Sequence, residues 1–254
     1  RQWRNRHARR HPRPEGNPCQ PAIRTAAQAL VQVLLAEGVT HVFCVPGESY
    51  LPVLDALWEV RERIAVVTCR HEAAAANMAV AHGKLTGRPG VCMVTRGPGA
   101  THAATGVHTA MQDSAPMILF VGQVARAHIG REAFQELDYP AVFGSMSKWA
   151  AQVDDPARMT EIVARAFATA EQGRAGPVVL ALPEDMLTEA VPVQVPAPRA
   201  LARSAPDAGF LKALAERLRA AERPMLILGG SGWTESAARG LADWAGRAGI
   251  PVAL

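Results

Sequence analysis

The sequence has little cysteine, few aromatic residues and no long hydrophobic run. Only 4 of its 254 residues are Cys, with no Cys-x-x-Cys pair, which excludes a disulfide-built scaffold. Clean apolar runs such as residues 117–121 and 178–182 are far shorter than the roughly 20 residues that a membrane-spanning helix needs. Aromatic residues make up 5%, and this composition favours packed helices and parallel strands over a β-sandwich.

Several common catalytic motifs are missing as well. The chain has no Gly-x-Gly-x-x-Gly fingerprint, no P-loop and no Gly-x-Ser-x-Gly elbow, which argues against a standard NAD domain, an NTPase and a hydrolase. It has no His-Glu-x-x-His motif, and His102 and His108 are poorly spaced for one helix face. We therefore expect no metal site built from this chain alone.

The formal net charge of +4 comes from one end of the chain. Residues 1–13 hold six arginines and no acid, whereas the other 21 basic residues are outnumbered by 23 acidic ones. The body of the protein is therefore not expected to bind nucleic acid. We expect residues 1–20 to form a basic tail without fixed structure. They lack the apolar segment of a secretory signal, and the scattered cysteines indicate the cytoplasm.

Short apolar strands alternate with amphipathic helices through residues 21–188. Strands are expected at 42–45, 64–68, 91–95, 117–121 and 178–182, and helices at 25–37, 51–60, 72–85, 100–111 and 157–171. Repeated units of this length predict an α/β domain with a doubly wound parallel sheet.

A change of composition marks the end of this domain. Residues 189–207 are rich in proline and are expected to be an extended linker. Residues 208–254 then give a helix, a strand, a second helix and the first residues of another strand. We interpret them as the start of a second, Rossmann-like α/β domain, so the sequence is expected to be a fragment.

In parallel sheets, ligands bind beyond the carboxyl ends of the strands. Three successive strands are followed there by Pro46-Gly47-Glu48, by His71-Glu72 and by Arg96-Gly97-Pro98-Gly99. Taken singly, each has a simpler reading. A carboxylate such as Glu72 suits any helix N-terminus, the glycines suit a tight turn, and Glu48 suits a solvated turn.

Taken in order, these segments carry a specific resemblance over residues 21–185. The matching motifs are Val42-Phe-Cys-Val-Pro-Gly-Glu-Ser, Arg70-His-Glu-Ala-Ala-Ala, Lys84-Leu-Thr-Gly-Arg-Pro-Gly-Val, Thr95-Arg-Gly-Pro-Gly-Ala-Thr, Met111-Gln-Asp-Ser-Ala-Pro-Met, Gly122-Gln-Val and Ala133-Phe-Gln-Glu. The chain closely resembles the N-terminal pyrimidine-binding domain of thiamine-diphosphate enzymes, in the acetolactate synthase and pyruvate oxidase group. Residues 208–254 resemble the start of that group's central domain.

The resemblance implies a catalytic role for Glu72. In the family, this glutamate shares a proton with N1′ of the cofactor's aminopyrimidine, which promotes ionisation of the thiazolium C2 and attack on a 2-oxo acid. By the same resemblance, the cofactor-binding residues are Pro46, Gly47, Glu48, Glu72, Thr95, Pro98 and Gly99. The implied substrate-side residues are Phe134, Gln135 and Lys148, of which Gln135 is also a catalytic candidate.

Further cofactor and partner expectations follow from the same likeness. Arg174 matches an arginine that contacts FAD in flavin-binding members, although it also fits a solvated loop, and Lys148 fits a surface or interface lysine equally well. Mg²⁺ and the diphosphate of thiamine diphosphate are held in the family by a C-terminal domain that these residues do not include. A homodimer or homotetramer with the cofactor between subunits is implied, and a 2-oxo acid is the implied substrate.

The chain departs from the acetolactate synthase pattern at three places. His102 replaces the asparagine that usually follows Gly-Ala-Thr, and Ala125 replaces the proline that usually follows Gln-Val. Glu184 replaces the lysine that usually follows the proline of the domain's last strand. We expect these differences to lie around the substrate entrance and the flavin region. They are expected to leave the thiamine chemistry intact.

Four functions remain open from the sequence. The leading one is the front part of an acetolactate synthase-like decarboxylase and carboligase. The second is another family member of the pyruvate oxidase, aldehyde lyase, sulfoacetaldehyde acetyltransferase or acyl-CoA decarboxylase type. The others are a non-catalytic pyrimidine-domain partner protein and a plain α/β nucleotide-binding module, for which the phosphate loop is missing.

Overall fold

The computed structural model describes residues 22–197, 202, 204–230 and 232–254, so the expected basic tail lies outside the described residues. Its main sheet has six parallel strands in the order β3-β2-β4-β5-β7-β6. These strands are β2 (His41–Cys44), β3 (Ala65–Thr68), β4 (Gly90–Thr95), β5 (Met117–Gln123), β6 (Trp149–Gln152) and β7 (Pro177–Pro183). The α/β fold with a parallel sheet is therefore confirmed.

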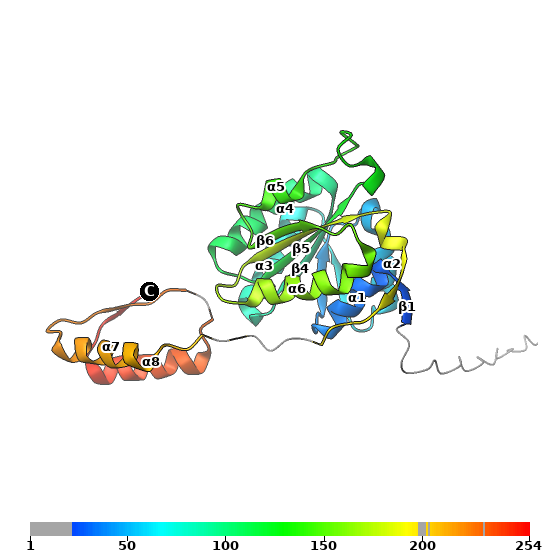
Figure 1. Cartoon of the computed structure of the whole chain (residues 1–254). Coiled ribbons are helices and arrows are strands. Elements are labelled where there is room, and N and C mark those ends of the chain that lie inside the picture. The colour runs from blue at the N-terminus through cyan, green and yellow to red at the C-terminus, as the bar shows by residue number, and fades with distance from the viewer. Residues whose placement is uncertain (1–21, 198–201, 203, 231) are drawn as a thin grey trace, which may run out of the picture.

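Helices cover both faces of this sheet (Figure 1). One apolar core lies under α1 (Ala26–Ala36), α2 (Leu51–Glu59) and α6 (Met159–Glu171). The other lies under α3 (Glu72–Thr86), α4 (Arg96–Gln112) and α5 (Tyr139–Phe143). Short 3-10 helices follow several strands and loops: η1 (Glu48–Tyr50), η2 (Arg126–His128), η3 (Pro156–Arg158) and η4 (Met186–Thr188).

Local sequence signals explain where several helices begin and end. Thr25 and Gln28 form a reciprocal capping box at the start of α1, and Gly87 ends α3 in the left-handed conformation with φ 69°. The start of α4 differs from expectation, because this helix begins at Arg96 rather than at residue 100. Pro98 is tolerated there since N–H groups of a first helical turn have no acceptor within the helix.

The cysteines of the sheet behave as small apolar residues. Cys44 and Cys92 are buried on adjacent strands, and Cys69 is half-buried. Burial raises the pKa of the Cys44 thiol to about 11 and shifts that of Cys92 upward as well. The thiols of Cys44 and Cys92 are therefore protonated packing groups at neutral pH.

The expected linker contains a strand that sequence reasoning missed. β8 (Ala190–Val193) pairs antiparallel with β1 (Ala22–Thr25), and Pro192 stands opposite Ile23. A two-stranded ribbon accepts a proline because one edge of each strand needs no partner. The strand β6 was also missed, since it has only four residues, all half-buried, and its apolar run of Trp149 to Ala151 is too short to stand out.

Residues 204–254 contain the elements expected for the start of a second α/β unit. They are α7 (Ala208–Ala220), β9 (Leu226–Ile227), α8 (Glu235–Ala248) and β10 (Val252–Ala253), with β9 and β10 parallel. None of the helices in the described ranges has the length and apolar character needed to cross a membrane.

Helices α3 and α4 pack unusually closely because their facing residues are small. Both helices contribute several buried alanines to one core, and Ala76 of α3 lies opposite Gly106 of α4. A Cβ added at Gly106 would lie 2.5 Å from the Cβ of Ala76, closer than two carbon atoms can approach. Only glycine fits at this position without moving the helices apart.

The substitution Gly106→Ala tests this packing. We expect it to lower the free energy of unfolding by about 1–3 kcal/mol through overpacking, although alanine is the better helix former by about 1 kcal/mol. Gly240→Ala in α8 is the matched control, because no atom lies within 4 Å of the added Cβ. Urea unfolding should show the control unchanged or stabilised; a stabilised Gly106→Ala variant would contradict the close approach.

Candidate functional site

The parallel strands bring the candidate residues to one edge of the sheet. The direction in which the chain adds strands to the sheet reverses between β2 and β4. From β2 the chain continues to β3 on one side of the sheet, whereas from β4 it continues to β5 on the other side. The carboxyl ends of β2, β3 and β4 therefore form a topological switch point, where α/β sheets bind ligands. Glu72 begins the helix that follows β3, at this edge.

Glu72 is held by a histidine from the neighbouring helix. Its side chain is 15% exposed, and its Oε2 lies 2.9 Å from Nδ1 of His102 on α4. The other carboxylate oxygen, Oε1, lies beside Gly99, 3.5 Å from where a Cβ of that residue would be. Glu72 thus has one oxygen engaged within the protein and the other next to a backbone without a side chain.

A second histidine stacks on this contact. The rings of His71 and His102 lie 4.7 Å apart at 27°, and Nδ1 of His71 accepts a hydrogen bond from the N–H of Ala73. Ligand-type atoms of His71, Glu72 and His102 lie within 4.8 Å of one another. Both Nδ1 atoms are already in hydrogen bonds, so His71, Glu72 and His102 form a hydrogen-bonded cluster to which no metal is assigned.

The segment after β2 packs directly against the end of β4. A Cβ added at Gly47 would lie 2.3 Å from the Cβ of Thr95, so the backbone can approach only at a glycine. The fully buried Ser49 hydrogen-bonds Thr95 through the two hydroxyl groups and fills the space over Gly122 of β5. Sequence reasoning missed Ser49, and the nearby candidates Pro46 and Glu48 are exposed.

Arg96 joins three of the strand ends through ion pairs. Its side chain is 9% exposed, and its two Nη atoms lie 2.7 Å from Oε1 of Glu48 and 2.9 Å from Oε2 of Glu184. Its backbone has φ 45°, in the region that residues with side chains rarely adopt. Its Nε and the hydroxyl of Tyr139 are buried without a hydrogen-bond partner among the described residues.

The substrate-side candidates Phe134 and Gln135 lie next to the first turn of α4. The carbonyl of Gln135 accepts a hydrogen bond of 2.9 Å from the N–H of Gly97, and Gln135 itself has φ 63°. The Phe134 ring is 72% exposed, with its centroid 6.0 Å from Cζ of Arg96. Pro98 is exposed on the same turn. The structure therefore brings both loop residues to the edge that carries Glu72.

Comparisons with known proteins agree with this geometry. Residues 24–142 match the family described as the thiamine pyrophosphate enzyme, N-terminal TPP binding domain. Residues 24–142 are therefore similar to the N-terminal domain of the thiamine pyrophosphate enzyme family. The family implied by the sequence motifs is confirmed.

Acetolactate synthases are among the relatives of this chain. It is 38% identical over 241 residues to the acetolactate synthase large subunit of Parasynechococcus marenigrum, covering 91% of this chain and 39% of that one. It is 42% identical over 165 residues to the large subunit of Pyropia yezoensis, covering 64% and 28%, and 37% identical over 210 residues to the acetolactate synthase of Bacillus subtilis, covering 81% and 36%. The chain thus spans at most about two fifths of the curated relatives it matches.

Two candidate site residues, Lys148 and Arg174, lie at the opposite edge of the six-stranded sheet. Lys148 directly precedes β6, and its Nζ donates to the carbonyl of Gln172 at 2.6 Å. Arg174 precedes β7 and donates to Ser114 and to the carbonyl of Met111 at the end of α4. Lys148 therefore does not belong with the substrate-side residues of the Glu72 edge, because it stands before its strand rather than after it.

His102 is also not where it was expected. We expected this departure from the family pattern at the substrate entrance or the flavin region, but the structure places it on Glu72 itself. Of the other two departures, Glu184 pairs with Arg96 at the Glu72 edge, and Ala125 directly precedes η2.

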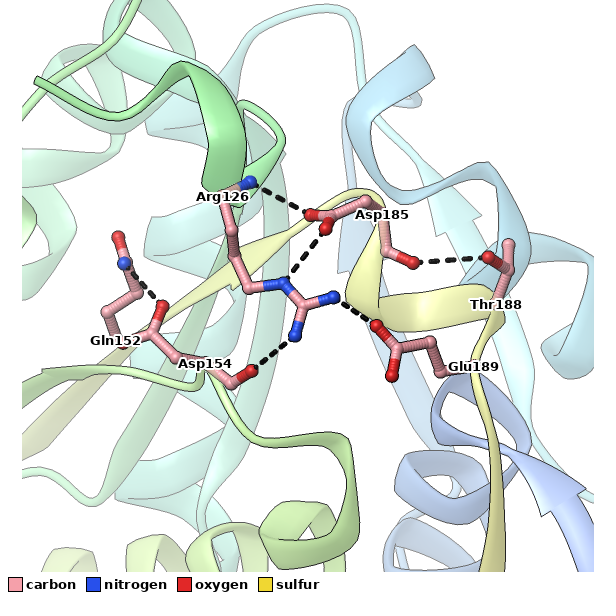
Figure 2. A network of polar contacts seen from close by, with 6 residues as sticks. All are labelled: Arg126, Gln152, Asp154, Asp185, Thr188 and Glu189. Atoms are coloured by element: carbon pink, nitrogen blue, oxygen red, sulfur yellow. Dashed lines mark hydrogen bonds and ion pairs between the residues drawn. The ribbon is translucent and has the colours of Figure 1, made fainter.

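A second arginine ties the loops after β5 and β7 together (Figure 2). The backbone N–H and the Nε of Arg126 donate to the two oxygens of Asp185 at 2.9 and 2.8 Å, and its Nη atoms contact the carbonyl of Asp154 and the carboxylate of Glu189. The carboxylate partners raise the pKa of Arg126. Burial favours a higher pKa for Asp185, but the hydrogen bonds from Arg126 outweigh it and lower this pKa.

The lowered pKa of Asp185 makes the contribution of this contact depend on pH. We expect Asp185→Asn to lower the free energy of unfolding at pH 7 by about 1 kcal/mol or less, because the side chain is over one third exposed and solvent screens the pair. The contribution is fully present above the ordinary Asp pKa of about 3.9 and is lost as the pH falls through the lower folded value. Urea unfolding at pH 7 and near pH 3 should show the difference shrinking; a constant difference would contradict the ion pair.

Proposed function

We propose that this chain supplies the pyrimidine-binding part of a thiamine-diphosphate-dependent 2-oxo acid decarboxylase and carboligase of the acetolactate synthase type. The observation that carries the proposal is Glu72, a largely buried carboxylate at a helix N-terminus and at the switch point of the sheet. The acetolactate synthase relatives support the reaction class, although the chain spans only part of their length.

The residues present fit the cofactor's aminopyrimidine. A ring nitrogen needs a carboxyl oxygen that can share a proton, and Oε1 of Glu72 receives no hydrogen bond from the described residues. Gly99 places no side chain beside this oxygen, so a flat ring can approach it. When bound, the cofactor supplies a thiazolium carbon that adds to the 2-oxo acid and accepts the electrons of decarboxylation.

The protein's own residues then have distinct roles in the proposal. Glu72 holds the proton shared with N1′, and Thr95 with Ser49 fixes the backbone beside the ring. Phe134 and Gln135 lie over the first turn of α4, where they border the substrate and exclude water. Mg²⁺, the diphosphate and the cofactor's second wall are supplied by a C-terminal domain of a partner subunit in a cytoplasmic homo-oligomer. FAD binding at Arg174 is a weaker part of the proposal, because this side chain already donates hydrogen bonds to carbonyl groups at the end of α4.

One observation favours a related member of the family over strict acetolactate synthesis. Glu184 stands where the family pattern has lysine, and it is neutralised by Arg96 rather than left to face a substrate. An oxidase, aldehyde lyase, sulfoacetaldehyde acetyltransferase or acyl-CoA decarboxylase would use the same activation by Glu72 with other substrates. Assays of the full-length enzyme with pyruvate as donor and different acceptors separate these outcomes.

The role of Glu72 is tested with the variant Glu72→Gln in the full-length enzyme. The amide cannot share a proton with N1′, so we expect exchange of the cofactor's C2 proton for deuterium to slow by about 100-fold or more. Glu62→Gln is the control, because Glu62 lies on an exposed turn with its side chain 90% exposed. An unchanged exchange rate in Glu72→Gln would remove the assignment.

The incomplete binding site gives a further expectation for the 254-residue chain by itself. Without the domain that holds Mg²⁺ and diphosphate, its dissociation constant for thiamine diphosphate should be weaker than about 1 mM. Titration calorimetry with Mg²⁺ present measures this constant. Tighter binding would show that the chain holds the cofactor without a second domain.

A further inference from the structure

The contact between His102 and Glu72 has a defined hydrogen-bond direction. An ionised carboxylate only accepts hydrogen bonds, so the hydrogen in this contact belongs to Nδ1 of His102. The opposite side of the His102 ring reaches solvent, because this side chain is 53% exposed. His102 thus donates through Nδ1 to Oε2 of Glu72 at 2.9 Å.

The stacked neighbour has the other tautomer. Nδ1 of His71 accepts from the N–H of Ala73 at 3.1 Å, so its own proton is on Nε2 when the ring is neutral. This bond makes His71 the N-cap of α3 and fixes its ring. The fixed ring supports the His102 ring at 4.7 Å and thereby limits where Nδ1 of His102 can point.

We propose that His102 is a positioning residue for Glu72. By occupying Oε2, it leaves Oε1, the oxygen beside Gly99, as the one that carries the proton shared with the cofactor's pyrimidine. This inference rests on the proposed function and adds the residue that determines the orientation of the catalytic carboxyl group.

The packing of the two helices supports the assignment. Ala76 lies one turn after Glu72 on α3, and Gly106 lies one turn after His102 on α4. The Ala76–Gly106 contact therefore lies directly behind the Glu72–His102 contact and fixes the distance between the helices. His102 has little freedom to move away from Oε2 while this packing persists.

Two substitutions separate positioning from other roles of the histidine. The amide nitrogen of asparagine is three bonds from Cα, as Nδ1 of histidine is, so His102→Asn keeps a donor near Oε2. His102→Gln places its amide one bond further out and loses that donor position. In the full-length enzyme, we expect His102→Gln to slow C2 exchange by about tenfold or more, the effect of losing one charge-assisted hydrogen bond, and His102→Asn to stay within about threefold of the parent enzyme.

His108→Gln is the matched control, since it makes the same change at an exposed position further along α4. It should leave the exchange rate unchanged. Circular dichroism of the bound pyrimidine's amino and imino forms should change in His102→Gln and be restored in His102→Asn. A purely structural role would lower the melting temperature without this selective rescue.

A readout without cofactor comes from nitrogen-15 NMR of the 254-residue chain. At neutral pH, the proton of His102 should be on Nδ1, and the signal is assigned by its loss in His102→Asn. A proton mainly on Nε2 would overturn the inference, as would wild-type exchange in His102→Gln. If the unmodified full-length enzyme shows no C2 exchange at all, the proposed function fails instead, so the two failures are distinguishable.

Discussion

The close contact between α3 and α4 is the constraint on which the candidate site depends. Both helices follow parallel strands and begin at the same edge of the sheet, so Glu72 in the first turn of α3 and His102 in the second turn of α4 lie side by side. Alanines and Gly106 let the axes approach far enough for a direct hydrogen bond between them. Larger residues in this contact would separate the carboxylate from its donor without touching either group.

The rest of the edge is held by charges rather than by apolar packing. Arg96 bridges Glu48 and Glu184, and Arg126 connects Asp185 with Glu189. Loops cannot bury enough apolar surface to fix themselves, so fork-shaped guanidinium groups with several donors join segments that are distant in sequence. The sheet thus fixes the strand ends, and the arginines fix the loops that leave them.

The sequence allowed the sheet, most of its helices and the position of Glu72 after a strand to be predicted, because apolar periodicity is a local signal. The catalytic role of Glu72 was implied only by the ordered motifs of the family resemblance and stays a prediction. Three features were out of reach for physical reasons. The strand β6 is short and half-buried at the sheet edge, so its apolar run is too short to indicate a strand. The His102–Glu72 bond depends on the spacing of two helices, and Lys148 could be assigned to an edge only once β6 was known to begin after it.

The ribbon of β1 and β8 determines how the domain is connected to the rest of the chain. Because the two strands pair antiparallel, the segment that enters the domain and the segment that leaves it meet at one place. A force applied to the chain beyond Val193 would act on the four residue pairs of this ribbon before it reached the six-stranded sheet. Tension in the chain after Val193 therefore acts on this ribbon first, and the geometry around the carboxylate stays constant while the ribbon remains paired.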